Sequence, residues 1–240
     1  MDEPKIKVGI CDGYPEVRGC LNGVYRGGGS SFTGEFVCRV LGGGVVLSDA
    51  FGRELLRGPE IRLIAERSGT FTLREVTIGV RFHWERREAQ TFPGDLIFLP
   101  AGVGVVTAVN ELPVEGYLAS VVSSEMSGEA PYAFLKAHAI ASRSWLVAML
   151  ERGRSGREKR ENRETVIQRE RQVIRWYDRE DHTRFDVCAD DHCQRYQGIT
   201  GRGAGRAAEA VRETRGVFLI HQGAICDARY HKACGGMTED

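Results

Sequence analysis

Apolar and polar residues alternate along the first hundred residues, which is the pattern of half-buried β-strands. The longest case is FTLREVTIGVRFHWE, where apolar side chains recur near every second position. These positions are Phe71, Leu73, Val76, Ile78, Val80 and Phe82. KIKVGI alternates in the same way, FPGDLIFLP and GVGVVTAVNELP predict two further strands that end at Pro113, and the glycine clusters in YRGGGSS and LGGGVVL mark turns. We therefore predict a β-rich region over residues 1–107.

The spacing of apolar residues changes at Pro113. From there to Met126 it follows the i, i+3, i+4, i+7 pattern of an amphipathic helix, and proline suits a first helical turn. The apolar positions are Val114, Tyr117, Leu118, Val121, Val122 and Met126. Gly128 and Pro131 interrupt the pattern, and a longer helix is predicted from about Tyr132 to Arg152. Its apolar stripe comprises Phe134, Leu135, His138, Ala141, Trp145 and Met149.

Residues 151–181 carry many charges of both signs, and we interpret them as a solvated insertion rather than a binding tail. The chain then becomes apolar enough to be compact again. AAEAVRETRG predicts a short helix that ends at Gly216, and VFLIHQGAICDARYH predicts a hairpin that turns near Gln222 and Gly223. The pattern as a whole predicts an α+β fold, in which the β-rich N-terminal region is followed, over residues 108–240, by two main helices and a small antiparallel sheet.

Composition and charge exclude several classes of protein. The chain has 240 residues, 42% hydrophobic and 8% aromatic, which is typical of globular proteins. Lys+Arg and Asp+Glu balance at 33 each, so there is no overall basic field to attract nucleic acid. No apolar run approaches the length of a transmembrane segment, and MDEPKIKVGI lacks the apolar core of a signal peptide. This N-terminus fits a cytoplasmic protein or a chain whose leader has been removed.

Glu125 lies where the apolar stripe of the first helix would continue. It follows Val121 and Val122 by four and three residues, so its carboxyl group should project from the buried face at the end of the helix. Poor solvation and the negative end of the helix dipole both favour a protonated carboxyl, and a general acid must carry a proton. On periodicity alone, a glutamate that reaches solvent or pairs with Arg143 is the simpler interpretation.

Several motifs around Glu125 occur in a specific order. A Leu-Pro-x-Glu-x-Tyr-Leu opening is followed by Val-x-x-Ser-Glu-Met and then by Leu-Lys-Ala-x-Ala-x-x-x-Arg. The matching residues are Leu112, Pro113, Glu115, Tyr117, Leu118, Val121, Ser124, Glu125, Met126, Leu135, Lys136, Ala137, Ala139 and Arg143. With CADDHCQRYQG, AVRETRG and ARYHKACGGMTE, they resemble the stage II sporulation protein D and amidase-enhancer family of bacterial peptidoglycan lytic transglycosylases. The resemblance covers roughly residues 108–240, and because the chain ends inside the last motif, we expect a C-terminal part to be missing.

The resemblance implies that Glu125 is the catalytic acid and base. In this family the bond between N-acetylmuramic acid (MurNAc) and N-acetylglucosamine (GlcNAc) is cleaved without water, and 1,6-anhydro-MurNAc forms. Glycosidases commonly need two carboxylates, but one can suffice where the substrate's own hydroxyl attacks. The candidate substrate-binding residues are Ser124, Arg143, Gln194, Tyr196 and His231. An ion pair is the simpler interpretation of Arg143, and Tyr196 is also an ordinary core residue.

Two tryptophans are further candidates for sugar binding. Trp84 and Trp145 could stack on sugar rings, although Trp145 lies on the core stripe.

The resemblance implies peptidoglycan glycan strands as the partner and the cell envelope as the location. One alternative is a non-catalytic cell-wall-binding module that enhances a partner amidase, and a weaker one is a zinc-stabilised structural domain. A binding module would not need an acid on an apolar face, so Glu125 favours the enzyme.

Cysteine and histidine gather in the last part of the chain. DHTRFDVCADDHC brings His182, Cys188 and Cys193 within twelve residues, and His192 adjoins Cys193. This spacing fits a zinc site and also fits reduced, buried cysteines beside solvent-facing histidines. Some members of the resembled family bind zinc through one His and two Cys of this stretch, which implies His182, Cys188 and Cys193 as ligands. Cys234 is either a fourth ligand or a plain substitution.

These hypotheses make two geometric predictions. If zinc is bound, the two sulfur atoms should lie within about 4 Å of each other, as tetrahedral ligands do. If one active site is formed, Glu125 should be largely buried and should open onto a groove lined by residues 188–196 and 231–238. Nothing local in the sequence brings these segments together, so the groove tests the whole interpretation.

Overall fold

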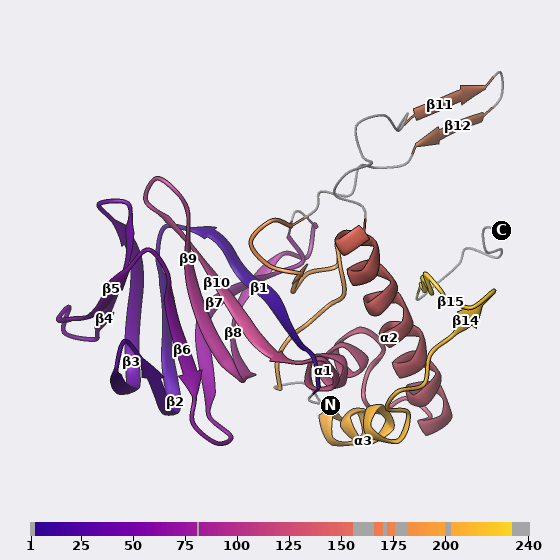
Figure 1. Cartoon of the computed structure of the whole chain (residues 1–240), viewed down its shortest axis with the longest axis horizontal. Helices are drawn as coiled ribbons and strands as arrows, with labels where there is room; N and C mark the ends of the chain where they lie inside the picture. The colour runs from indigo at the N-terminus through magenta and orange to yellow at the C-terminus, as the bar shows by residue number, and fades with distance from the viewer. Residues whose placement is uncertain are drawn as a thin grey trace.

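The computed structural model describes residues 3–80, 82–155, 166–169, 172–175, 182–199 and 203–231. Its β-rich N-terminal region stands beside a second region that contains three helices (Figure 1). The predicted α+β class is therefore confirmed. In the part of the chain that is described, no helix combines the length and the apolar character needed to cross a membrane.

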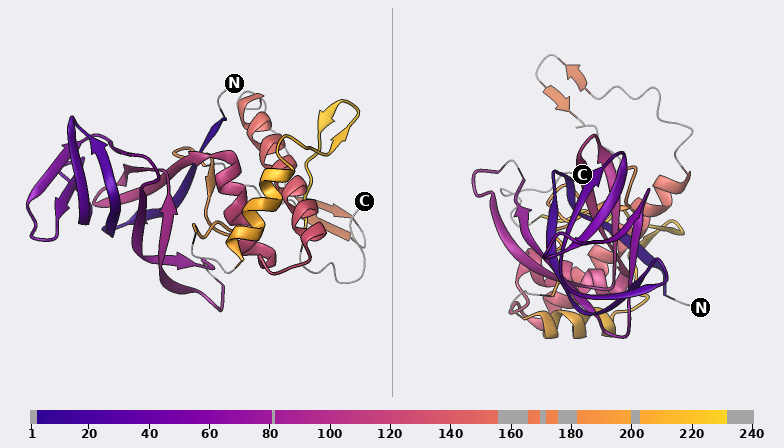
Figure 2. Two further views of the ribbon diagram at one scale, coloured as in Figure 1. Left: turned by 90° about the horizontal axis from the view of Figure 1, so that it is seen from below. Right: turned by 90° about the vertical axis from the view of Figure 1, so that its left-hand side faces the viewer.

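The N-terminal region is built from ten strands that precede the first helix. They are β1 (Lys5–Tyr14), β2 (Val17–Gly27), β3 (Ser30–Leu41), β4 (Gly44–Asp49), β5 (Glu54–Gly58), β6 (Ile61–Ala65), β7 (Thr70–Ile78), β8 (Arg86–Pro93), β9 (Asp95–Gly102) and β10 (Val105–Pro113). With β13 (Val187–Cys188) they form an 11-stranded sheet in the order β13-β1-β10-β9-β6-β2-β3-β4-β5, from which β7 branches to pair with β2 and β8. The sheet curves strongly, so that its strands wrap around their own apolar side chains (Figure 2).

The alternation predicted for β7 is correct as far as Ile78. Phe71, Leu73, Val76 and Ile78 are all buried. Val80 and Phe82, which continue the same pattern in the sequence, are 44% and 49% exposed. The strand ends because Gly79 adopts a left-handed backbone conformation with φ +70°, which turns the chain away from the sheet. The prediction that these two residues belong to the strand was wrong, and they lie in the β7–β8 loop instead.

The predicted helices are present. α1 spans Val114–Met126, α2 spans Tyr132–Ser155 and α3 spans Ala204–Glu213. Pro113 caps α1 with φ −58°, and Ser127 ends it with a positive φ of 67°. Most of the apolar stripe of each of α1 and α2 is buried where the three helices pack together, and α3 lies against both (Figure 2). Phe134, which was predicted on the α2 stripe, is instead 44% exposed. The end of α1 meets the start of α3 at two glycines: a Cβ added to Gly128 would lie 2.4 Å from the carbonyl oxygen of Gly203.

A column of aromatic rings connects the sheet to the helices. Tyr25 packs against Phe71 with ring centroids 6.4 Å apart, and Phe71 against Phe92 at 5.5 Å. Phe92 contacts Tyr196 at 5.6 Å, and Tyr196 stacks on Tyr117 of α1 at 5.2 Å. All five side chains are almost completely buried. The two regions therefore share one continuous core.

The later part of the chain returns to the sheet and then forms a hairpin. β13 pairs with β1 in parallel, which places the His/Cys segment against the N-terminal region. β14 (Ile220–His221) and β15 (Ala224–Ile225) form the predicted hairpin, with positive φ at Gln222 and Gly223. Within the charged segment 151–181, β11 (Val166–Arg169) pairs with β12 (Gln172–Arg175). The proposed division at residues 107/108 falls inside β10 and stays a prediction.

Candidate functional site

The carboxyl group of Glu125 lies in the last turn of α1 and faces His138 of α2. Glu125 Oε2 is 3.3 Å from His138 Nε2, and the two side chains are 14% and 3% exposed. The predicted burial of Glu125 is thus confirmed. Neither ring nitrogen of His138 has a hydrogen-bond partner among the described residues, so this contact is a close approach rather than an aligned hydrogen bond. The sequence pattern had placed His138 on the apolar stripe only, although a titratable side chain on a core stripe is itself a signal of a functional site.

The second oxygen of Glu125 is held by the backbone of a distant segment. The N–H group of Arg195 donates a hydrogen bond of 2.9 Å to Glu125 Oε1. The Arg195 side chain is anchored in turn by Asp191, at 3.0 and 2.9 Å. A backbone donor cannot rotate away as a side chain can, so it fixes the orientation of the carboxyl group. One oxygen is therefore anchored, and the other points toward His138.

Tyr230 packs against His138 and joins it to the segment that follows the His/Cys cluster. Its ring meets that of His138 edge to face, with centroids 4.8 Å apart. Its hydroxyl oxygen accepts hydrogen bonds from Gln194 Nε2 at 3.0 Å and from the Ser142 hydroxyl at 3.3 Å. Burial first, and then the charge of Glu125, raise the pKa of the Tyr230 hydroxyl, so it stays a neutral hydrogen-bond donor. Tyr230 was not predicted as a site residue, because a single tyrosine in ARYHKAC carries no periodic signal.

The prediction that Arg143 binds substrate was wrong, because its side chain is buried between the helices. It is 1% exposed and forms a bidentate ion pair with Glu115, at 2.9 and 2.6 Å. It also donates to the carbonyl oxygen of Val211 at the end of α3, at 3.1 Å. The hydrogen bonds of the guanidinium group therefore join α2 to α1 and α3. This is the structural ion pair that the apolar context of Arg143 favoured.

The other candidate substrate residues divide into two groups. Tyr196 and Gln194 are 1% and 2% exposed, and the Tyr196 hydroxyl donates to Asn110 Oδ1 at 2.6 Å. The predicted contact between Tyr196 and a sugar is wrong, because the Tyr196 ring is buried in the aromatic column. The Gln194 amide donates to Tyr230 and to the Ser142 carbonyl oxygen, and its substrate role stays a prediction. Ser124 is half-buried beside Glu125 in sequence, and His231 is exposed at the end of the described chain. Their substrate roles stay predictions.

Four side chains of the His/Cys segment converge on one point. The ligand atoms of His182, Cys188, His192 and Cys193 all lie within 4.8 Å of one another. Cys193 Sγ is 3.4 Å from His182 Nε2 and 3.4 Å from His192 Nδ1, and Cys188 Sγ is 3.8 Å from His192 Nδ1. Neither cysteine forms a disulfide. The three predicted ligands converge, and His192, which adjoins Cys193 in the sequence, is a fourth member of the cluster. The expected separation of about 4 Å between the two sulfur atoms stays a prediction.

Local backbone structure explains this convergence. β13 pairs Cys188 with Gly9 of β1, and a turn closed by the Cys193 N–H and the Asp190 carbonyl, 3.0 Å apart, brings Cys193 back to face it. The contact with Cys188, together with the imidazoles of His182 and His192, holds the pKa of the Cys193 thiol well below its usual value. The pKa of Cys188 is raised, chiefly by Cys193. Thiolates are the metal-binding form of cysteine, so the cluster could hold a metal ion.

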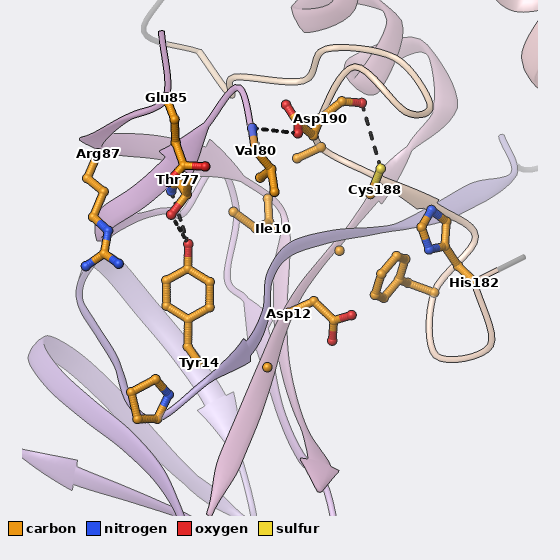
Figure 3. A pocket seen from close by; sticks show the side chains of 15 residues that line it. Ile10, Asp12, Tyr14, Thr77, Val80, Glu85, Arg87, His182, Cys188 and Asp190 are labelled. Carbon is orange, nitrogen blue, oxygen red and sulfur yellow. Dashed lines mark hydrogen bonds between the residues drawn. The ribbon is translucent and has the colours of Figure 1, made fainter. Parts of the chain in front are cut away.

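A cavity of about 550 Å³ lies beside the cluster (Figure 3). Its lining includes Asp12, Tyr14 and Arg87 from the N-terminal region and His182 and Asp190 from the His/Cys segment. Glu125 does not line it. The bond from Arg195 confirms that Glu125 approaches segment 188–196. Residues 232–238, including Cys234, lie outside the described residues, so the predicted groove over Glu125 stays a prediction.

Fold and site together define an α+β protein with a buried acid on α1 and a cluster suited to a metal ion. A family model, SpoIID, described as stage II sporulation protein, matches residues 103–221. That range includes Glu125, His138 and the whole His/Cys cluster. Residues 103–221 are therefore a SpoIID domain, and that family is associated with cell-wall lytic activity. Searches of curated proteins and of solved structures gave no match.

Proposed function

We propose that this protein is a lytic transglycosylase that cleaves the MurNAc–GlcNAc bond of peptidoglycan glycan strands and leaves 1,6-anhydro-MurNAc ends. The observation that carries the proposal is the environment of Glu125. One carboxyl oxygen is anchored by the Arg195 N–H, and the other lies 3.3 Å from His138 inside a largely buried site. A single positioned carboxyl can serve as acid and then as base.

The first step breaks the glycosidic bond. Protonated Glu125 gives its proton to the bridging oxygen, and the bond from that oxygen to C1 of MurNAc breaks. GlcNAc leaves as an alcohol, and positive charge develops at C1. The carboxylate that remains stabilises this charge, and its orientation does not change because Arg195 still holds one oxygen.

The second step restores the acid. The C6 hydroxyl of the same MurNAc attacks C1, a new C–O bond closes the anhydro ring, and the hydroxyl proton passes to Glu125. Atoms and charge balance without water, because the nucleophile belongs to the substrate. His138 contacts Glu125, and Tyr230 contacts His138, so we assign both residues positioning roles.

We propose zinc as the ion of the His/Cys cluster. For a tetrahedral zinc bound by two sulfurs and two nitrogens, ligand atoms are separated by roughly 3.4 to 3.8 Å, given bonds of about 2.0 to 2.3 Å. Three of the separations, at 3.4, 3.4 and 3.8 Å, lie in this range, and all four ligand atoms lie within 4.8 Å of one another. A closed set of four protein ligands is typical of a structural zinc. Its role would be to hold the segment that presents the Arg195 N–H to Glu125.

The proposal includes a location and a partner. Peptidoglycan glycan strands are the expected substrate, and the cell envelope is therefore the expected place of action. A non-catalytic module that enhances an amidase is the alternative. It would bind cell wall and need no working Glu125, so product chemistry separates the two.

The test is the chemistry of the products. Purified glycan strands treated with the protein should yield 1,6-anhydro-MurNAc ends, identified by mass spectrometry. Glu125→Gln should keep the same unfolding midpoint and lose at least about 100-fold in rate, since the amide cannot supply an acidic proton. Glu129→Gln, an exposed glutamate just beyond α1, is the matched control and should retain full activity.

Two results would contradict the proposal. Reducing MurNAc ends as the main product would indicate hydrolysis by water. Strands that stay uncut by the wild-type protein, together with faster turnover by an added amidase, would favour the enhancer alternative.

A further inference from the structure

The loop between β7 and β8 carries two aromatic side chains outside the core. Phe82 is 49% exposed, and Trp84 beneath it is half-buried. Their rings are stacked, with centroids 5.4 Å apart and planes inclined by 15°. The pair presents a flat aromatic surface beyond the buried part of β7, which ends at Ile78.

The loop is held in place by bonds to the His/Cys segment. The N–H group of Gly79 donates to one carboxylate oxygen of Asp190 at 3.2 Å. The N–H group of Val80 donates to the other at 3.0 Å (Figure 3). Two turns follow, in which Phe82 N–H donates to Gly79 and Glu85 N–H donates to Phe82. The Trp84 ring packs directly on Gly79, where a Cβ would lie 2.3 Å from the ring. The aromatic pair is therefore positioned before any ligand arrives, which lowers the entropy cost of binding.

The same segment connects this pair to the proposed catalytic carboxyl. The guanidinium carbon of Arg195 lies 5.0 Å from the centre of the Trp84 ring. The backbone N–H of that same residue holds Glu125. Arg195 thus contacts the Trp84 ring through its side chain and Glu125 through its backbone. Asp191 holds the Arg195 guanidinium group in place by an ion pair.

We propose that Phe82 and Trp84 form a sugar-binding subsite for a glycan strand whose scissile bond lies at Glu125. This inference rests on the proposed function and extends it to the N-terminal region. The C–H faces of pyranose rings are apolar and pack flat on aromatic rings, while ring hydroxyls and N-acetyl groups need polar partners at the edge. Arg86 lies 6.0 Å from the centre of the Trp84 ring, and with Arg195 it provides such donors.

The subsite makes binding depend on the length of the substrate. A strand that reaches from Glu125 to the aromatic pair gains the stacking contact, whereas a fragment too short to reach Phe82 does not. The β-rich region would then favour long glycan strands over short ones. Phe51, in the β4–β5 turn, offers a matched control because it is 97% exposed and its turn joins the last two strands in the order of the same sheet.

The experiment measures binding of peptide-free glycan strands to the full chain carrying Glu125→Gln, so that the strands stay intact. Adding Phe82→Ala should weaken binding about tenfold, because one stacked aromatic contact is lost. Phe82→Tyr should restore it, and Phe51→Ala should leave it unchanged. Unfolding midpoints confirm that each variant is folded, and Phe82 suits this test because nearly half of its surface is already exposed.

The outcomes separate this inference from the proposed function. If wild-type protein forms anhydro ends but Phe82→Ala binds strands as tightly as its parent, the subsite is wrong and the enzyme proposal stands. That result would also be expected if the aromatic pair contacted another protein. If no anhydro ends form and no strand binds, the proposed function fails and the subsite fails with it.

Discussion

At the scale of single residues, Glu125 and Arg143 are both largely buried, so their polar atoms interact with other protein groups. Glu125 is held by one backbone N–H and one imidazole, and Arg143 satisfies its guanidinium entirely within the protein. The two residues occupy similar positions on apolar stripes, yet only Glu125 keeps an oxygen outside a hydrogen bond among the described residues. That difference separates a group available for proton transfer from one that stabilises packing.

Replacing Arg143 tests its structural role. Arg143→Met should lower the free energy of unfolding by about 3 kcal/mol, because it leaves Glu115 and the Val211 carbonyl without their partner in a largely buried position. Urea denaturation measures this change. Arg53→Met, which breaks an ion pair with Asp49 on a side chain that is 79% exposed, should change stability by less than about 0.5 kcal/mol. Equal effects of the two substitutions would contradict the assignment.

At the scale of elements, close approaches between helix ends position the site. α1 ends at Met126 beside the start of α3, and the backbones of Gly128 and Gly203 come together without room for a side chain. The β7–β8 loop is fixed in a comparable way by Asp190. Elements that were predicted one by one are thus assembled through contacts between residues far apart in the sequence.

The contact between α1 and α3 can be tested with two glycines. Gly128→Ala should destabilise the protein by about 1–3 kcal/mol, because the added Cβ would lie 2.4 Å from a backbone oxygen that cannot rotate away. Gly205→Ala within α3 meets no atom within 4 Å, and it should be neutral or stabilise by up to about 1 kcal/mol. Thermal unfolding of both variants gives the answer, and a harmless Gly128→Ala would mean that the two loops are not in contact.

At the scale of the whole molecule, the N-terminal sheet and the helical region are joined by shared packing and by strand pairing. They share the aromatic column from Tyr25 to Tyr117, and β13 adds a strand from the later region to the sheet. The His/Cys cluster stands where these parts meet, beside the 550 Å³ cavity. An ion in that cluster would therefore stabilise the join between regions as well as its own loop.

Removal of metal should affect the protein as a whole. The purified protein is expected to contain one zinc per chain by elemental analysis, and a chelator should lower both the unfolding midpoint and the rate of strand cleavage. His192→Ala should reduce the zinc content, because it removes one of four converging ligands. Cys226→Ser, at a free cysteine outside the cluster, should leave the zinc content unchanged. Loss of zinc from both variants, or from neither, would refute this ligand set.

The sequence by itself determined most of the elements and predicted Glu125 as the candidate acid. Helix and strand periods are local, so the stripes of α1 and α2, the alternation of β7 and the position of Glu125 on a buried face could be predicted from spacing. Family motifs added the His/Cys set apart from His192.

Only the tertiary structure decided what surrounds these groups. The donor to Glu125 comes from a residue 70 positions later, and Phe82 left the strand because of a left-handed glycine and a carboxylate 110 positions away. Tyr196 is buried with its hydroxyl bonded to Asn110, 86 positions away, and the ion-pair partner of Arg143, Glu115, lies 28 positions away. Such contacts depend on how elements pack, and the spacing of residues within one element contains no information about them.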